Sequence, residues 1–231
     1  MKPVEFIKNE IINFKKSEII SFIAIISLVT SISIYSKDSL VALISAICGI
    51  CYTIFAGYGK VYCYLIGMLG TFCYCYLAYK NGFWGNLCLY GLYYFPMEVI
   101  GIFQWEKNLK KNKNEIIKTK LNSKERFLYL LLGLLFTLLL FLILKSLNGK
   151  NPVLDSFITV FSIIGQLLTV KRCVEQWYIW FFVNLASLVM WIYAVLNGAD
   201  CTATVLMWGI YLILSVYFLR RWNREIKKTG E

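Results

Sequence analysis

Apolar runs close to the length of a bilayer crossing recur along the whole sequence, and this recurrence limits the possible folds more than any other feature. A membrane-spanning helix needs about 20 predominantly apolar residues. The chain is 59% hydrophobic and 16% charged, whereas a typical soluble domain carries roughly 25% charged residues. We therefore expect an all-α polytopic membrane protein with one membrane domain and no soluble domain.

The apolar runs divide into eight predicted spans. Between the fourth and the fifth lies a long charged loop, KNLKKNKNEIIKTKLNSKER. The first run lacks the small-residue cleavage site of a secretory signal peptide and is too long for one, so we expect it to stay as an extra N-terminal helix. The predicted spans cover residues 19–35, 39–57, 60–80, 83–105, 127–146, 153–170, 174–196 and 200–221.

The basic residues fall mostly on one side of the predicted membrane. Of the 24 Lys and Arg residues, all but Lys37, Lys80, Lys145 and Lys150 lie in the terminal segments or in the loops after the second, fourth and sixth spans. Because cytoplasmic loops are enriched in Lys and Arg, we expect a cytoplasmic-membrane protein with both termini in the cytoplasm. Topology then accounts for the net charge of +11, which needs no nucleic-acid partner.

The second half of the sequence resembles the first when it is shifted by a constant number of residues. The matches align spans two to four with spans six to eight, and span five makes the two triplets parallel. Parallel repeats occur in transporters that bind substrate near the midplane; chance similarity among apolar helices is the alternative. The shift places Gly49 on Gly165, Tyr62 on Tyr178, Asn81-Gly82 on Asn197-Gly198 and, with one inserted residue, Tyr94 on Tyr211 and Trp105 on Trp222.

This repeat predicts a 3+1+3 parallel-repeat core behind the extra N-terminal helix. A substrate site is then expected between the two repeats. The expected parts are an N-terminal cytoplasmic segment and extra helix at 1–38, a first three-helix repeat at 39–105, a basic cytoplasmic loop and linker helix at 106–152, a second three-helix repeat at 153–222 and a cytoplasmic tail at 223–231.

One face of the seventh span carries aromatic and polar side chains at helical spacing. Trp177, Trp180, Asn184, Ser187 and Trp191 follow one another at steps of three and four, which places them on one side of a helix. An unpaired amide in hydrocarbon costs several kcal/mol, so this face should point at other helices or at a ligand. Asn184 could contact a ligand or link two helices, and Trp177 and Trp191 could instead be interfacial anchors.

Most other polar groups at membrane depth belong to the fourth span. Glu98 is the carboxylate well inside a span, and an intramembrane ionisable group is a functional candidate by default; the alternative is a boundary residue paired with a loop lysine. Pro96 must disturb the helix just before it, which suits a binding site or a hinge. We also assign Tyr94, Gln104 and Gln176 to the candidate site, and note Gln166 in the sixth span.

Such a pocket, walled by Trp and Tyr and equipped with amides and one acid, suits a flat polar ring that is uncharged or cationic. Aromatic faces stack on the ring and attract positive charge. The amides can bond an exocyclic amide or sugar hydroxyls. The pocket suits phosphate badly, because no Lys or Arg lies at depth and phosphate sites favour these residues.

The sequence does not favour an enzyme, a metal site or a cofactor. It has no histidine, which is the commonest general base and a common metal ligand. The aspartates stand singly near span ends, and Cys48-x-x-Cys51 lies inside a span, where free Cys is more often a small buried residue than a redox pair. A channel with a Glu98 ring would leave the aromatic stripe without a role.

The motif Glu175-Gln176-Trp177-x-x-Trp180-x-x-x-Asn184 resembles the signature of the PnuC-type nicotinamide riboside transporters. The resemblance covers about residues 39–222 and implies a three-plus-one-plus-three fold related to the SWEET and semiSWEET sugar transporters, assembled as a homotrimer. It also implies facilitated diffusion of an unphosphorylated vitamin precursor, which phosphorylation in the cytoplasm then traps. Further matching positions are Asp155-Ser156, Lys171-Arg172, Pro96-Met97, Gly101 and Trp105.

The resemblance assigns the substrate-facing motif to Gln176, Trp180 and Asn184. We expect a bacterial nicotinamide riboside uniporter whose halves rock around the site, with Trp180 stacked on the pyridinium ring and the two amides bonded to the carboxamide or ribose. Glu98 would bind hydroxyls or balance the positive charge. It departs from the amide expected there, so thiamine or another vitamin is an alternative substrate, and a non-transporting receptor or assembly partner is an alternative of another class. The candidate binding residues are Trp180, Asn184, Gln176, Glu98, Tyr94, Gln104, Ser187 and Trp177.

Overall fold

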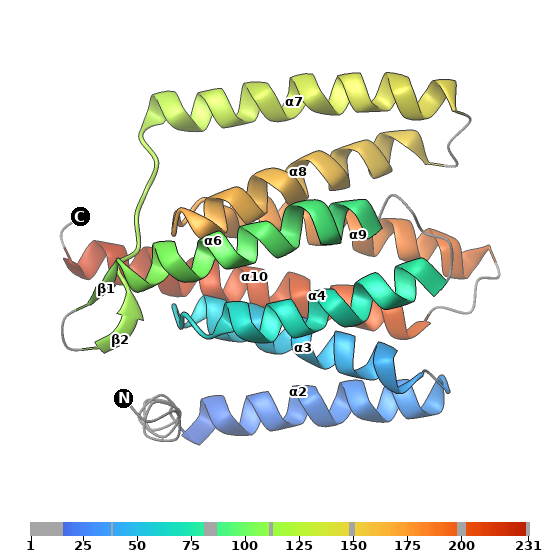
Figure 1. Cartoon of the computed structure of the whole chain (residues 1–231), viewed down its shortest axis with the longest axis horizontal. Coiled ribbons are helices and arrows are strands. Elements are labelled where there is room, and N and C mark those ends of the chain that lie inside the picture. The colour runs from blue at the N-terminus through green and yellow to red at the C-terminus, as the bar shows by residue number, and fades with distance from the viewer. Residues whose placement is uncertain are drawn as a thin grey trace.

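The computed structural model describes residues 16–37, 39–80, 87–110, 113–147, 151–197 and 202–229, and its long helices lie roughly side by side (Figure 1). Each predicted span coincides with a helical segment, so the all-helical architecture is confirmed. The segments are α2 (Lys16–Tyr35), α3 (Leu40–Gly57), α4 (Cys63–Lys80), η1 (Leu89–Tyr94) with α6 (Phe95–Glu106), α7 (Ser123–Ser146), α8 (Pro152–Val170), α9 (Gln176–Leu196) and α10 (Thr202–Thr229).

Five helices in the described residues are long and apolar enough to cross a membrane. They lie in α2, α3, α7, α8 and α10. The prediction of a multi-pass helical protein is therefore confirmed at this level, while eight crossings stay a prediction. The expected N-terminal cytoplasmic segment before Lys16 lies outside the described residues.

Local sequence signals fix several helix ends. The Ser39 hydroxyl accepts the Ala42 N–H at 3.2 Å and caps α3. At the start of α7, Asn122 and Glu125 form a reciprocal capping box, with bonds of 2.8 and 2.9 Å. Each arrangement satisfies amide donors that the first helical turn leaves unpaired.

The fourth predicted span is irregular just before Pro96. Residues Leu89–Tyr94 form a π-helical turn, and the Phe95 N–H donates to the carbonyl of Tyr90 five residues back. Proline lacks the N–H that would continue an α-helical ladder, and π turns inside helices occur frequently at functional sites. The disturbance predicted at Pro96 is therefore present, as a π-helical turn that ends four residues before Glu98.

Six helices pack in chain order and close into a ring. The first three are linked by contacts of α3 with α4 and of α4 with α6, and the last three by contacts of α8 with α9 and of α9 with α10. Contacts of α6 with α8 and of α3 with α10 close the ring. Outside it, α2 lies on α3 and α10, and α7 lies on α8 (Figure 1).

Two buried tryptophans tie the first triplet of helices to the second. Trp105 at the end of α6 donates its indole N–H to the Thr169 carbonyl of α8 at 3.0 Å. Trp222 on α10 donates to the Gly57 carbonyl of α3 at 2.7 Å. The two bonds are reciprocal, because the last helix of each triplet reaches the C-terminal end of the first helix of the other triplet.

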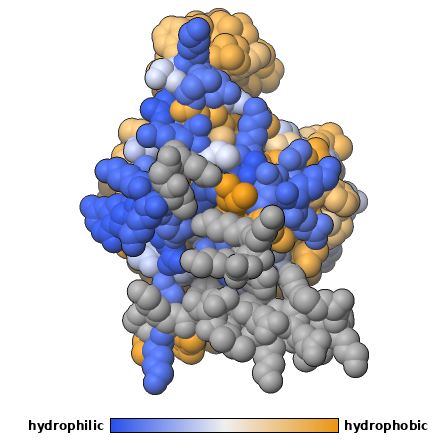
Figure 2. Space-filling model, turned by 90° about the vertical axis from the view of Figure 1, so that its left-hand side faces the viewer, coloured by the Kyte–Doolittle hydropathy of each residue, from blue (hydrophilic) through white to orange (hydrophobic). Residues whose placement is uncertain are grey.

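Hydrophilic residues gather at the end of the bundle that carries both ends of the described chain (Figure 2). A short antiparallel hairpin, β1 (Leu109–Lys110) and β2 (Lys113–Ile116), lies there in the basic loop. Within the segment predicted as a cytoplasmic tail, 223–231, α10 continues to Thr229 and Ile226 is buried. An apolar residue that packs against the bundle keeps these last turns helical.

Residues 116–121, which we call the strap, cross this hydrophilic end and contact both triplets of helices. On the first triplet, the fully buried Ile116 donates its N–H to the Gly59 carbonyl at 3.1 Å. Gly59 has a φ of 72°, and a Cβ there would lie 3.0 Å from the Ile116 side chain. Glycine tolerates both the positive φ and this close approach.

The strap is bonded more heavily to the turn between α8 and α9. Thr119 donates its N–H to the Arg172 carbonyl and accepts the Val174 N–H, both at 2.9 Å. Lys118 is 5% exposed and pairs with Glu225 of α10. Burial lowers the pKa of the Lys118 amine, and the neighbouring carboxylate opposes that shift.

Candidate functional site

The predicted inward face of α9 is confirmed by its burial. Asn184 is 6% exposed and Ser187 is fully buried, whereas Tyr178, Phe182 and Leu185 on the opposite side are exposed. The helical periodicity therefore identified the side of α9 that faces the ring of helices.

Trp180 lies against α8. Its indole N–H donates to the Thr169 hydroxyl at 3.1 Å. A Cβ at Gly165 would lie 3.1 Å from the indole ring, so the glycine lets the aromatic ring approach the α8 backbone. The ring is thus held in one position by a bond at its edge and by a backbone surface below it.

The side chains of Asn184 and Ser187 differ from most buried polar groups, because they make no hydrogen bond within the described residues. The Ser187 hydroxyl is buried and has no hydrogen-bond partner in the described part of the chain. Within the same residues, no hydrogen bond of the Asn184 amide occurs, so it does not link two helices here. Leaving such a buried group unsatisfied costs about 1–3 kcal/mol, which favours a role in binding a polar molecule.

A polar stripe runs along one buried face of α8. Ser162, Gln166 and Thr169 are buried and lie at steps of four and three along the helix, hence on one side. The Tyr52 hydroxyl of α3 donates to the Gln166 carbonyl oxygen at 3.2 Å across the ring, and the Tyr94 hydroxyl lies close to Ser162. Tyr52 was not predicted from the sequence, and Gln166 was noted there but not assigned to the site. The spacing of Ser162, Gln166 and Thr169, at steps of four and three, is the signal that identifies this stripe.

Glu98 is buried where α4 and α6 meet. One of its oxygens accepts the Thr71 hydroxyl at 3.0 Å, and the other is buried with no partner among the described residues. The structure shows no ion pair of Glu98 with a lysine in those residues, so the alternative of a boundary carboxylate paired with a loop lysine is not supported. A hypothetical Cβ at Gly67 would lie 2.8 Å from both Glu98 and Tyr52, so these two side chains lie against the same glycine.

The structure places three of the predicted site residues elsewhere. Gln176 is buried at the start of α9, and its amide donates to the Cys173 carbonyl at 3.0 Å. Trp177 packs against Phe218 and Trp222 of α10, with ring centroids 5.2 and 5.8 Å away. Gln104 is exposed on α6. Tyr52 links Glu98 to Gln166, because its hydroxyl bonds Gln166 and its ring lies against the same Gly67 as Glu98. Trp180 lies against α8, and Asn184 and Ser187 lie on the buried face of α9.

Comparison with known proteins decides the family. The family model described as nicotinamide mononucleotide transporter matches residues 39–224. The chain belongs to this family. The match excludes α2, which lies outside the ring of six helices.

Two curated proteins are similar to this chain over most of their length. The nicotinamide riboside transporter PnuC of Haemophilus influenzae is 28% identical over 199 residues, which are 85% of this chain and 85% of the relative. The protein of the same name from Neisseria mucosa is 30% identical over 200 residues, which are 84% and 76% of the two chains. The chain is therefore related to transporters and not to enzymes, as the sequence predicted.

A solved structure shares the fold. The crystal structure described as the vitamin B3 transporter PnuC superposes with a TM-score of 0.80, at 27% identity, and covers 94% of each chain. This coverage extends beyond the family model. The membrane-transporter architecture is thus supported by sequence and by structure.

Proposed function

We propose that this chain carries nicotinamide riboside across the cytoplasmic membrane. Both curated relatives are named for this substrate. The single observation that carries the proposal is the arrangement around Glu98. One carboxylate oxygen is buried without a partner in the described residues, and the Tyr52 ring, whose hydroxyl bonds the Gln166 amide, lies against the same Gly67 as Glu98. A cationic pyridinium ring with an uncharged sugar matches that chemistry.

The same arrangement favours the riboside over the mononucleotide that the family's description mentions. The buried lysines of the described chain, Lys60 and Lys118, lie next to the Gly59 turn at the hydrophilic end. No Lys or Arg in the described part of the chain joins Glu98, Gln166 and Asn184. A phosphate would face a carboxylate without a compensating cation, and phosphate sites favour Arg or Lys.

In the proposed complex, Trp180 stacks on the pyridinium ring and Asn184 bonds the carboxamide. Ser187 and Tyr94 lie around the substrate, and Glu98 balances the positive charge. Gln166, held by the Tyr52 hydroxyl, replaces Gln176 as the amide for the ribose. The Gln176 amide instead donates to the Cys173 carbonyl.

The proposed mechanism is facilitated diffusion by alternating access. The halves are the predicted repeats 39–105 and 153–222, with α7 as the linker. The reciprocal Trp105 and Trp222 bonds support such a pseudo-symmetric pair, because each half holds the other in the same way. Phosphorylation in the cytoplasm would trap the substrate after entry.

The proposed topology places both termini in the cytoplasm of a bacterial cell. Both ends of the described chain lie at the hydrophilic end of the bundle, and basic loops favour the cytoplasmic side.

We also propose a homotrimer, which mass measurement in detergent tests. A monomeric or dimeric mass at working concentration would contradict the trimer alone and leave the transport proposal standing.

Calorimetry in detergent tests the substrate assignment. We expect nicotinamide riboside to bind, and both its mononucleotide and thiamine to bind at least tenfold more weakly, which corresponds to about 1.4 kcal/mol. Preference for thiamine would move the assignment to another vitamin. Flux of the riboside into protein-loaded liposomes, without an ion gradient, separates a uniporter from a non-transporting receptor.

Two substitutions test the site. Trp180→Ala and Asn184→Ala should abolish riboside binding and flux while the protein still inserts. Phe182→Ala is the matched control, because Phe182 lies on the same helix and is 54% exposed. Normal uptake by both site variants, or equal loss in the control, would contradict the site.

A further inference from the structure

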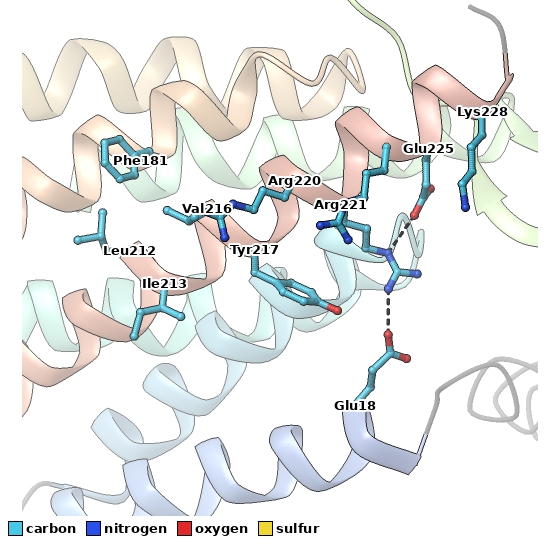
Figure 3. Close-up of a pocket in the computed structure, with 11 residues that line it drawn as sticks. Glu18, Phe181, Leu212, Ile213, Val216, Tyr217, Arg220, Arg221, Glu225 and Lys228 are labelled. Atoms are coloured by element: carbon cyan, nitrogen blue, oxygen red, sulfur yellow. Dashed lines mark hydrogen bonds and ion pairs between the residues drawn. The ribbon is translucent and has the colours of Figure 1, made fainter.

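A groove of about 940 Å³ lies on the outside of the bundle, between the start of α2 and the α9–α10 pair. It is separate from the proposed substrate site, since its lining residues lie on the outer faces of these helices. Apolar side chains such as Phe181 and Leu212 line one end, and charged side chains such as Arg220 and Lys228 line the other (Figure 3). The groove is therefore amphipathic along its length.

Three basic residues form a stripe at the charged end. Arg220, Arg224 and Lys228 lie four residues apart on α10, hence on one face of the helix. All three line the groove and are exposed. Within the described residues none of them takes part in an ion pair.

The neighbouring Arg221 behaves differently. It pairs with Glu18 of α2 at 3.0 Å and with Glu225 at 2.9 Å, and its guanidinium lies 4.3 Å from the Tyr58 ring centroid. Arg221 thus holds the start of α2 against α10 and forms one wall of the groove. The groove's two carboxylates are engaged by Arg221, which leaves the positive charge of the other three for an occupant.

The apolar end lies farther along α10, toward the middle of the bundle. Ile213, Val216 and Leu212 line it together with Phe181 of α9. Ile213 is 70% exposed. The apolar part of α10 thus gives way to the basic stripe along the helix (Figure 3). The stripe lies toward the hydrophilic end of the bundle, where the headgroup region of a membrane would lie.

We propose that this groove binds one anionic glycerophospholipid. Its phosphate would bond the stripe of Arg220, Arg224 and Lys228, and an acyl chain would lie along Val216 and Phe181. Basic pockets between membrane helices on the cytoplasmic side are suited to anionic headgroups, and Arg binds phosphate through paired N–H donors. The lipid would join the extra helix α2 to the ring of six helices.

Native mass spectrometry of the full chain with added dioleoylphosphatidylglycerol or dioleoylphosphatidylcholine tests this proposal. Each basic residue near a charged membrane surface contributes about fivefold to the affinity for anionic lipid. Replacing all three (Arg220→Gln, Arg224→Gln, Lys228→Gln) should therefore weaken phosphatidylglycerol binding about a hundredfold. Phosphatidylcholine carries the same phosphate but offsets its charge with choline, so it should bind the parent more weakly and should lose less affinity than phosphatidylglycerol in this variant.

The matched control removes three exposed charges from the same end but outside the groove: Lys107→Gln, Lys120→Gln and Lys124→Gln. It should change phosphatidylglycerol binding by less than about threefold. Equal loss in both triple variants would mean general surface attraction and would overturn the proposal, as would unchanged binding in the groove variant.

A second variant separates a lipid from a free phosphate. Val216→Trp keeps every charge and fills the apolar end, so it should weaken phosphatidylglycerol binding at least tenfold. Unchanged binding in this variant, or displacement of the lipid by millimolar inorganic phosphate, would reduce the site to an anion contact and overturn the proposal. A change in oligomeric mass that follows the groove variant would assign the groove to a second copy of the chain instead.

Discussion

At the scale of single residues, Glu98 has the clearest electrostatic role to test. It keeps one oxygen for Thr71 and holds the other buried without a partner in the described residues. A hydrogen bond to a charged group contributes about 1.5–3 kcal/mol. A carboxylate that meets a cationic ligand in a low dielectric gains more than it would in water.

Glu98→Gln should therefore weaken nicotinamide riboside binding by roughly one to two orders of magnitude. The reduced riboside, whose ring is uncharged, should bind the variant and the parent equally. Calorimetry with the two ligands measures the difference, and an equal loss for both would show that Glu98 acts through shape or folding.

Gly165 offers a second test at this scale. A methyl group at Gly165 would meet the Trp180 ring at 3.1 Å, so Gly165→Ala should displace the indole and weaken riboside binding about tenfold. Gly209→Ala is the control, since nothing lies within 4 Å of its Cβ position. Both replacements gain about 1 kcal/mol of helix propensity, so the thermal stability of the Gly209→Ala control should not fall. If riboside affinity were unchanged in Gly165→Ala as well as in the control, the packing role of Gly165 would be contradicted.

At the scale of elements, the strap couples the turns of the two triplets. Thr119→Pro removes the N–H that donates to the Arg172 carbonyl, since proline has no amide hydrogen. Amide hydrogen exchange at Val174 should become faster, because its N–H donates to the Thr119 carbonyl. Riboside flux should fall, because the strap no longer holds the turn between α8 and α9 in a fixed position. Thr119→Ser keeps both the amide and the hydroxyl and should behave like the parent; unchanged exchange at Val174 in the proline variant would show that the strap is held by other contacts.

At the scale of the whole molecule, the two reciprocal indole bonds should stabilise the halves to a similar extent. Trp105→Phe and Trp222→Phe each remove one buried hydrogen bond, which contributes about 0.5–1.5 kcal/mol; the Thr169 carbonyl keeps the Arg172 N–H as its other donor. Each should lower the unfolding temperature in detergent by about 2–4 °C per kcal/mol. Trp208→Phe is the control, because the Trp208 indole makes no hydrogen bond within the described residues; a large loss there, or a loss in only one of the other two, would contradict the paired role.

The sequence predicted the helices well and the site only in part, for a physical reason. Hydropathy and helical periodicity are local, so the span at 127–146 matches α7 (Ser123–Ser146), and the inward face of α9 is confirmed. The bonds from Tyr52 to Gln166 and from Thr71 to Glu98 join helices far apart in the chain, and no local pattern encodes such pairs. The strap was unexpected as well, because burial of Lys118 depends on Glu225 about a hundred residues away.

The position of α7 has a consequence for mutational tolerance. Its main contact in the described structure is with α8, and only 6% of its apolar window is buried. Most of its leucines are exposed on the outside of the bundle, and an exposed apolar position does not select one apolar side chain over another. Random exchange among Leu, Ile, Val and Phe along α7 should therefore be accepted at nearly every position. Gly133 is the exception, because a Cβ there would lie 2.9 Å from Phe161.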